Sequence, residues 1–433
     1  MNRLRATALL GVSSSLGKNI LSLYFLQFAN YVLPLATIPY LVRVLGPENY
    51  GIIAFGQSLI TYFVIVVNYG FAWSATRDIS VHREDMARVS RTASGVWGAQ
   101  LLFGLAGFVV LLLLISLVPK LRDISPVLLI LYGIVLGNAL FPDWLFLGLE
   151  RMVAISLINL ITRLVGALGI FTLIHQPSDY VLYAALLSFQ WIAAGILGVW
   201  FALAILKVRV TMPCFGDIWR VLRDGAMLFL SSASHSLYTS SNSLILGLLT
   251  NYTAVGYYSG AEKIVLTVLN LLDPVSKAVY PRFSKMASVS TARVLFWGRR
   301  LLYAMGTLGI GMTIVLFSTA PFAVDVILGP KYGPAVVVAR ILSFLPVSSA
   351  VGYVLGTELM LPFGMDRYFM CILVGAGVVN IALAAVLAPM WQASGMATAY
   401  LVSETFVTGS MFACLSYRRL NPLFYRPQLT TDT

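Results

Sequence analysis

The sequence of 433 residues contains little charge and very little cysteine or histidine. Asp, Glu, Lys and Arg make up 11% of it, whereas a soluble domain carries about 25%, so a soluble globular protein is excluded. Cys214, Cys371 and Cys414 are odd in number and scattered, and imply no disulfide framework. No cluster has metal-ligand spacing, and no Ser/His/Asp set stands out. The sequence therefore predicts no metal centre and no cofactor.

Long apolar runs fill the sequence instead. Hydrophobic residues make up 59% of it, the mean hydropathy is +0.87, and a helix needs about 20 apolar residues to cross a bilayer. We therefore predict an all-α, polytopic membrane protein with twelve transmembrane helices. They lie near residues 19–42, 50–73, 93–118, 126–148, 152–175, 180–206, 224–249, 254–283, 300–328, 335–358, 367–389 and 393–416.

A weak internal sequence similarity divides these helices into two halves. LGPENYGIIAFG (45–56) and LGLLTNYTAVGYYSG (246–260) each join a polar-striped helix to the next through a short turn that contains Asn-Tyr. Both turns are entered from the same side, as in a parallel repeat about an axis along the membrane normal. We expect two pseudo-symmetric six-helix lobes around a central cavity. The predicted parts are residues 1–206, a linker over 207–223, a second lobe over 224–416 and a tail over 417–433.

The basic residues indicate which ends face the cytoplasm. The chain has 29 Lys and Arg against 17 Asp and Glu, a net charge of +12. Most of the basic residues lie in the termini and in every second connection between apolar runs, and the positive-inside rule then places both termini in the cytoplasm. Basic patches interleaved with aromatic residues are absent, so the charge does not indicate a nucleic-acid partner.

Polar residues recur at helical spacing inside several apolar runs. Gln27, Asn30, Pro34 and Thr37 lie at i, i+3, i+7 and i+10 of the first run, on one face of a helix. A polar face at membrane depth contacts protein or water, because hydrocarbon cannot satisfy it. Two interpretations remain open here, the wall of a cavity and a seam between packed helices.

Charged residues also lie deep in two of the predicted helices. Arg163 follows Asn159 by one turn in the fifth helix, where a charge at the membrane centre costs about 2.5–3.5 kcal/mol. Either an anionic ligand or a buried carboxylate would offset that cost. The eighth helix carries Lys263 and Asn270 on one face.

The remaining candidate residues are the acids of the eighth helix and the polar residues of the seventh helix. Glu262 and Asp273 lie on an adjoining face of the eighth helix, and Asp273 can pair with Lys277 at i+4. Ser231–Ser243, which includes His235 and Asn242, is polar on every face, so it is either central or closely packed by its small residues.

Several stretches resemble one family. They are Asn30–Leu35 (NYVLPL), Val44–Gly51 (VLGPENYG), Asn138–Met152 (NALFPDWLFLGLERM) and Leu328–Tyr332 (LGPKY). The sequence resembles the bacterial polysaccharide flippases, the O-antigen and exopolysaccharide transporters of the multidrug/oligosaccharidyl-lipid/polysaccharide exporter superfamily. Leu147 stands where the family often has glutamine, which removes any polar role at that position.

The resemblance implies a transporter rather than an enzyme. Its members flip undecaprenyl-diphosphate-linked oligosaccharide repeat units across the bacterial inner membrane by alternating access. Expected partners are the lipid-linked oligosaccharide, membrane lipid, a coupling ion (H+ or Na+) and polysaccharide polymerase machinery. On this interpretation, the candidate substrate-binding residues are Arg163, Lys263, Asn30, Gln27, Asn159, Asn270 and Asn242, and the candidate coupling residues are Glu262, Asp273 and His235.

Two alternatives differ in testable ways. A multidrug exporter of the same superfamily handles cations and tends to need an acidic cavity, whereas Arg163 and Lys263 favour an anionic substrate. A membrane polysaccharide polymerase or ligase usually carries a large outer loop, whereas the outer loops predicted here are short.

Overall fold

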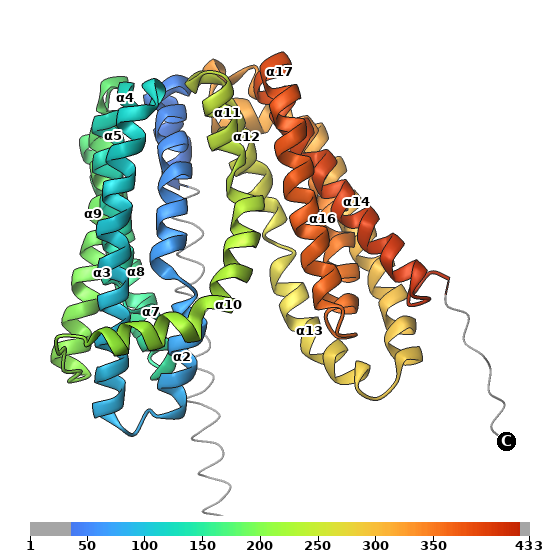
Figure 1. Ribbon diagram of the computed structural model, residues 1–433. Coiled ribbons are helices and arrows are strands. Elements are labelled where there is room, and N and C mark those ends of the chain that lie inside the picture. The colour runs from blue at the N-terminus through green and yellow to red at the C-terminus, as the bar shows by residue number, and fades with distance from the viewer. Residues whose placement is uncertain (1–35, 425–433) are drawn as a thin grey trace, which may run out of the picture. The chain divides into compact units, whose positions relative to one another are not determined.

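The computed structural model describes residues 36–424, without the side chains of residues 227, 228, 230–240 and 277. Every regular element in the described range is a helix (Figure 1), which confirms the all-α prediction for that range. Helices are the expected solution for an apolar chain, because they satisfy their own backbone hydrogen bonds in lipid. By contacts the chain forms two compact units, Met1–Leu45 with Leu59–Ala233, and Gly46–Ser58 with Ser234–Thr433.

The helices of unit 1 follow a stretch that is helical over residues 36–68. They are α2 (Phe71–Val81), α3 (Met86–Leu117), α4 (Pro119–Asp123), α5 (Ser125–Leu131), α6 (Gly133–Leu140), α7 (Asp143–Gly148), α8 (Met152–Leu173), η1 (Pro177–Asp179), α9 (Tyr180–Trp200), η2 (Phe201–Ile205, a π-helix) and the first part of α10 (Phe215–Ser240). Local sequence sets several of these starts. Asp85 caps α3 by accepting hydrogen bonds from the backbone N–H groups of Ala87 and Arg88, both at 3.1 Å.

Unit 2 contains residues 46–58 of that first helical stretch, the end of α10 and the remaining helices. They are α11 (Asn242–Leu249), α12 (Tyr252–Leu269), α13 (Asp273–Ala287), α14 (Thr291–Ile327), η3 (Pro330–Tyr332), α15 (Ala335–Leu342), α16 (Leu345–Tyr353), η4 (Val354–Met360, a π-helix) and α17 (Asp366–Tyr417). Asn251 caps α12 by accepting a hydrogen bond from the Ala254 N–H at 2.8 Å.

Eight helices in the described range are long and apolar enough to cross a membrane. Two of them contain a break. Gly46 has a φ of 75° within residues 36–68, and Gln392 has a φ of 49° within the 52 residues of α17. These breaks coincide with the turns predicted near residues 43–50 and 390–392. The predicted total of twelve spans stays a prediction, since the first begins outside the described residues.

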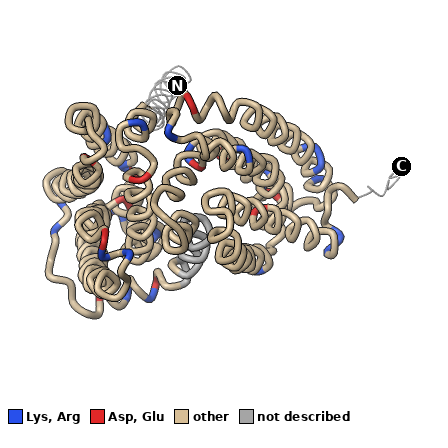
Figure 2. Tube along the Cα trace, turned by 90° about the horizontal axis from the view of Figure 1, so that it is seen from above, with Lys and Arg blue, Asp and Glu red and all other residues tan. Residues whose placement is uncertain are grey.

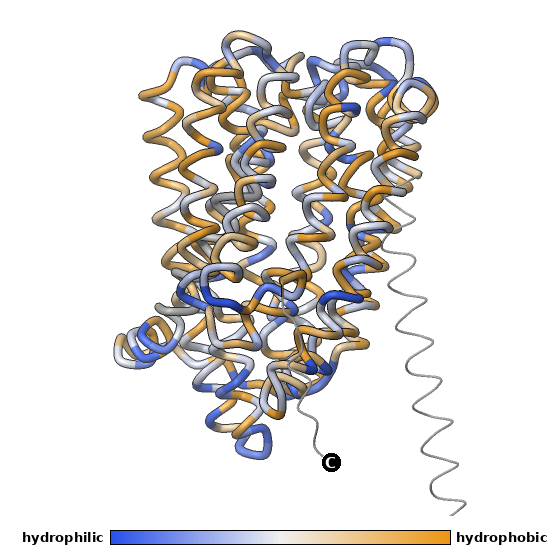
Figure 3. Tube along the Cα trace, turned by 90° about the vertical axis from the view of Figure 1, so that its right-hand side faces the viewer, coloured by the Kyte–Doolittle hydropathy of each residue, from blue (hydrophilic) through white to orange (hydrophobic). Residues whose placement is uncertain are grey.

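The outer faces of the long helices are apolar. On α14 the exposed side chains include Ile310, Ile314, Val315 and Phe322, and Figure 3 shows hydrophobic colour along most of the helical tubes. Charged residues are sparse along the traced chain in Figure 2. In a soluble protein such a surface would be an aggregation site, whereas lipid solvates it.

The LGPENYG stretch packs on the start of α12. A Cβ added at Gly51 would lie 1.8 Å from the carbonyl oxygen of Tyr252, and one added at Gly256 would lie 1.9 Å from the carbonyl oxygen of Pro47. The Phe55 and Tyr252 rings contact each other with centroids 5.6 Å apart. The two similar stretches, 45–56 and 246–260, therefore contact each other backbone to backbone, and glycine is required on both sides of the contact.

The NALFPDWLFLGLERM stretch is part of the core of unit 1. Trp144 and Phe146 of α7 are buried, and the Thr76 hydroxyl of α2 donates to the Trp144 carbonyl at 3.1 Å. Trp144 packs with Ile79 in one apolar cluster. The structure thus gives this stretch a packing role.

Candidate functional site

The predicted cation of unit 1 lies in the middle of α8. Arg163 is half-buried there, as is Asn159 one turn before it. The guanidinium is not a free cation, because Arg163 has an interaction partner within the protein. The Thr162 hydroxyl between them donates to the Ile158 carbonyl at 3.0 Å, so it faces its own backbone.

The predicted cation of unit 2 lies in α12 beside an acid. Lys263 is exposed and Glu262 is half-buried, and the Tyr258 hydroxyl donates a hydrogen bond of 2.8 Å to Glu262 Oε1. Asn270 is exposed at the end of the same helix. As the helical geometry predicts, Glu262 is directed to Tyr258 at i−4.

Asn242 lies beside this pair. It is 2% exposed at the start of α11, and its amide is next to the Tyr258 hydroxyl. Among the side chains that the structure describes, neither amide atom has a hydrogen bond of normal geometry. An amide buried beside a phenol can donate to it or accept from it, so Asn242 belongs to the polar surroundings of Tyr258 and Glu262.

A second acid–phenol pair lies further along the same unit. The Tyr353 hydroxyl donates to Asp273 Oδ1 at 2.7 Å, and the Tyr353 phenol also interacts electrostatically with Glu404. Tyr400, which is 7% exposed, interacts with both Glu404 and Glu262. Tyr400 and Glu404 are thus close enough to both pairs to interact with them electrostatically.

We call this set the carboxylate–tyrosine network. Its members come from α12, α13, α16 and α17 and are Tyr258, Glu262, Asp273, Tyr353, Tyr400 and Glu404. Carboxyl and phenol groups take up and release protons and form hydrogen bonds to each other in more than one arrangement. The network therefore brings together carboxyl and phenol groups from four helices of unit 2.

Glu358 is a buried acid that sequence reasoning missed. It is 1% exposed, its Oε1 accepts a hydrogen bond of 2.6 Å from the Ser276 hydroxyl, and its Oε2 has no hydrogen-bond partner among the described side chains. It lies in η4, and π-helical turns are often found at functional sites. A single acid inside the apolar run 335–358 is the signal that would have found it.

Several predicted site residues are not tested by this geometry. Gln27 and Asn30 lie outside the described residues, and His235 lies in α10 where side chains are not described. The predicted Asp273–Lys277 pair is also untested, because the Lys277 side chain is not described, although Asp273 does have Tyr353 as a partner. Among the described residues, no group of three or more His, Cys, Asp or Glu could hold a metal ion.

Comparison with known proteins identifies the family. The model of the family described as "Polysaccharide biosynthesis protein" matches residues 16–287, which is more than half of the chain. The chain belongs to this family. The resemblance seen in the sequence is thus confirmed, and as a polysaccharide biosynthesis protein with many apolar helices the chain is a multi-pass membrane protein.

Two relatives of this polysaccharide biosynthesis protein carry the name "Putative O-antigen transporter". The one from Escherichia coli (strain K12) is 30% identical over 413 residues, which are 94% of this chain and 98% of the relative. The one from Shigella dysenteriae is 27% identical over 395 residues, 90% of this chain and 97% of the relative.

Two solved structures share the fold of this chain. A structure titled "Lipid II flippase MurJ, inward closed conformation" has a TM-score of 0.71 at 12% identity and covers 93% of this chain and 90% of its own. An inward-facing multidrug resistance MATE family transporter has a TM-score of 0.67 at 14% identity, with 90% and 95% covered. At these identities the likeness establishes the fold.

Proposed function

We propose that the protein is a flippase for polyprenyl-diphosphate-linked oligosaccharide repeat units used in O-antigen or exopolysaccharide assembly. The observation that carries this proposal is the relative named as an O-antigen transporter, at 30% identity over 94% of the chain. The fold shared with a structure titled as a lipid II flippase supports it, because lipid II is also a lipid-linked saccharide.

The chemistry of such a substrate explains the cations within the apolar helices. Moving an ionised diphosphate into hydrocarbon would cost tens of kcal/mol by idealised estimates, and each unpaired sugar hydroxyl several more. Arg163 and Lys263 supply positive charge for the diphosphate. Amides supply donors and acceptors for the sugars, and those proposed for this role are Asn159, Asn242, Asn270, Gln27 and Asn30.

We further propose twelve spans in two six-helix lobes, with both termini in the cytoplasm and the protein in the bacterial inner membrane. Charge within unit 2 supports this orientation. At one end of α14 the Arg299 guanidinium donates to the Pro422 carbonyl at 2.8 Å, so this end also carries the basic residues that follow α17. Lys331 lies beyond the other end. The excess of basic residues at the first end is typical of a cytoplasmic face.

Coupling to protons fits the carboxylate–tyrosine network. Its acids Glu262 and Asp273 each accept a hydrogen bond from a phenol, and the acids are spread over several helices. A sodium or calcium site instead gathers many oxygens around one point. Protonation of these acids in turn would let an ion gradient bias the protein between two conformations.

Deletion of the gene tests the function. The expected result is loss of surface polysaccharide, with lipid-linked repeat units accumulating at the inner leaflet, and restoration of both by the plasmid-borne gene. If the protein were a polymerase, the deletion would instead leave single repeat units on the surface. If it were a multidrug exporter, the deletion would leave the polysaccharide intact and change drug susceptibility. Either of these two results would refute the flippase assignment.

A further inference from the structure

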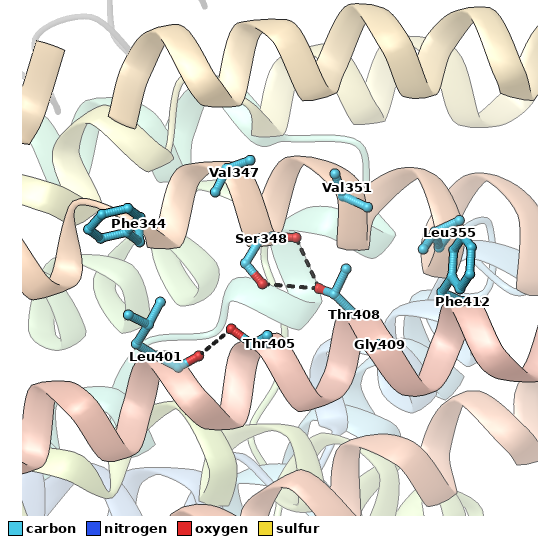
Figure 4. A pocket seen from close by; sticks show the side chains of 10 residues that line it. All are labelled: Phe344, Val347, Ser348, Val351, Leu355, Leu401, Thr405, Thr408, Gly409 and Phe412. Atoms are coloured by element: carbon cyan, nitrogen blue, oxygen red, sulfur yellow. Dashed lines mark hydrogen bonds between the residues drawn. The ribbon is translucent and has the colours of Figure 1, made fainter. Parts of the chain in front are cut away.

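A long groove runs between α16 and the second half of α17 (Figure 4). It encloses about 510 Å³ and is open along one side. Phe344, Val351 and Leu355 line it from α16 and its neighbouring residues, and Leu401, Gly409 and Phe412 line it from α17. A Cβ added at Gly409 would meet no atom within 4 Å, so the groove has open space at that point.

The groove presents hydrocarbon even where its residues are polar. The Thr408 hydroxyl donates to the Ser348 carbonyl at 3.0 Å and lies 3.2 Å from the Ser348 hydroxyl. The Thr405 hydroxyl donates to the Leu401 carbonyl at 2.8 Å. Because these hydroxyls already have partners in the wall, the groove suits an apolar occupant and not a sugar or a peptide.

The length of the groove corresponds to one leaflet of a bilayer. Its lining runs from residue 344 to 355 on one side and from 401 to 412 on the other. Eleven residues of helix rise about 16 Å, and half of the hydrocarbon core is about 15 Å thick. A single acyl chain of one leaflet therefore matches the groove, whereas a polyprenyl carrier chain is several times longer.

The end of the groove near Phe412 leads to a basic, aromatic rim. The Phe412 ring contacts the Phe424 ring with centroids 5.9 Å apart, and Arg418 and Arg419 lie between these two residues in the chain. The Arg418 guanidinium stacks over the Tyr368 ring, 4.9 Å from its centroid, and donates to its hydroxyl. Tyrosine and arginine together are typical of the headgroup level of a membrane.

The charge at this rim is positive. Arg418 and Arg419 are exposed, and so are Arg367 and its acidic neighbour Asp366. Within the part of the chain that the structure describes, no carboxylate lies within 4.0 Å of the Arg418 or Arg419 guanidinium. Basic residues at the mouth of a groove between membrane helices attract an anionic lipid headgroup.

We propose that the groove binds one acyl chain of an anionic phospholipid, with the phosphate of its headgroup held at Arg418 and Arg419. The chain length, the apolar lining and the basic rim at one end all match this single ligand. The site is distinct from the carboxylate–tyrosine network and does not depend on the proposed transport function.

Filling the groove tests the acyl-chain half of the proposal. The protein is purified in detergent, stripped of lipid and titrated with phosphatidylglycerol, and bound lipid is counted by native mass spectrometry. Gly409→Phe is expected to weaken binding about tenfold or more, since a ring would occupy the space of the chain. Gly311→Phe is the matched control, because Gly311 is also exposed on a long helix with no atom within 4 Å of an added Cβ.

Removing the charge tests the headgroup half. The unaltered protein is expected to prefer phosphatidylglycerol over phosphatidylcholine, and Arg418→Gln with Arg419→Gln should reduce that preference about tenfold. Arg91→Gln with Arg223→Gln removes the same charge from exposed positions of unit 1 and should leave the preference unchanged. If Gly409→Phe fails to fold by size exclusion, Thr405→Phe replaces it, as its hydroxyl bonds only within its own helix.

Three results would overturn the proposal. The first is equal binding by the Gly409→Phe and Gly311→Phe proteins, and the second is equal affinity of the unaltered protein for the two phospholipids. The third is displacement of phosphatidylglycerol by polyprenyl phosphate at equal concentration, which would assign the groove to the carrier lipid instead. All three are binding measurements, so they are independent of whether the protein flips oligosaccharides.

Discussion

At the scale of single residues, unit 2 is notable for acids that have phenols as partners. Tyr258 donates to Glu262 and Tyr353 donates to Asp273, at 2.8 and 2.7 Å. A phenol keeps its proton at neutral pH, so each tyrosine stabilises the charged form of its acid without neutralising it. That arrangement holds each acid in a defined orientation by a neutral donor.

Replacing Glu262 by glutamine tests proton coupling. Glu262→Gln keeps the shape and the Tyr258 hydrogen bond but cannot titrate, so we expect normal membrane abundance and loss of any dependence of transport on the pH gradient. The measurement is uptake of a lipid-linked oligosaccharide into proteoliposomes with and without an imposed gradient. Thr267→Ala, on the same helix and bonded to its own backbone, is the control. Gradient-driven transport by Glu262→Gln would exclude Glu262 from coupling.

Substitutions at Arg163 test whether its guanidinium binds the diphosphate of the substrate. If the guanidinium attracts substrate, Arg163→Ala should lower surface polysaccharide about tenfold or more at normal abundance, since a charge-assisted hydrogen bond contributes about 1.5–3 kcal/mol. Arg163→Lys should retain part of the activity if charge alone matters. If Arg163 instead pairs with a buried acid, Arg163→Ala should lower abundance. Arg151→Ala, at the exposed start of α8, is the control, and full transport by an Arg163→Ala, Lys263→Ala protein contradicts the proposal.

Sequence reasoning found only part of the residue-scale picture. Glu262 and Asp273 were predictable because acids are rare in apolar runs. Their partners Tyr258 and Tyr353 were not, because a tyrosine in such a run has the same pattern as a core residue. The Tyr353–Asp273 contact joins residues 80 positions apart, and no local spacing encodes it.

At the scale of elements, the positions of the breaks between helices were easier to predict than which helices pack against each other. Gly46 and Gln392 break the helical geometry where the apolar runs were expected to turn, since a span cannot exceed the membrane thickness by much. The pairing of α16 with α17 that forms the groove depends on packing between distant segments. Hydropathy alone does not specify which apolar faces meet.

The contact of Gly51 and Gly256 gives a prediction about packing. Gly51→Ala or Gly256→Ala places a Cβ within 2 Å of a backbone oxygen, so the helices must separate. We expect a loss of about 1–3 kcal/mol, seen as a lower melting temperature in detergent and lower membrane abundance. Gly311→Ala adds the same methyl group in open space and should change neither. Unaltered melting of both variants would mean that the contact is looser than described.

At the scale of the whole molecule, composition predicted the class of protein and the long apolar helices. The division of the chain into the two units was harder to predict from the sequence. Residues 46–58 group with unit 2 although they lie in the sequence among residues of unit 1. Membership of a unit depends on tertiary contacts, which an apolar pattern does not specify.

Orientation is the prediction that belongs to this scale. A reporter fused after Leu420, and one inserted in residues 207–223, should be active only when the reporter works in the cytoplasm. Alkaline phosphatase and a cytoplasmic fluorescent protein, each fused at the same sites, provide the comparison. A periplasmic signal at Leu420 would contradict the even number of spans.

The backbone contact between the two similar stretches also has a consequence for how the protein is made. Gly51 and Phe55 have their partners at residues 247–256, about 200 positions later in the chain. At roughly 5–20 residues per second, the ribosome needs some ten to forty seconds to supply them. During that time Gly51 and Phe55 lack the residues that they pack against in the folded protein. Cells that overproduce the protein should therefore place a heavy load on the machinery that shelters incomplete membrane helices.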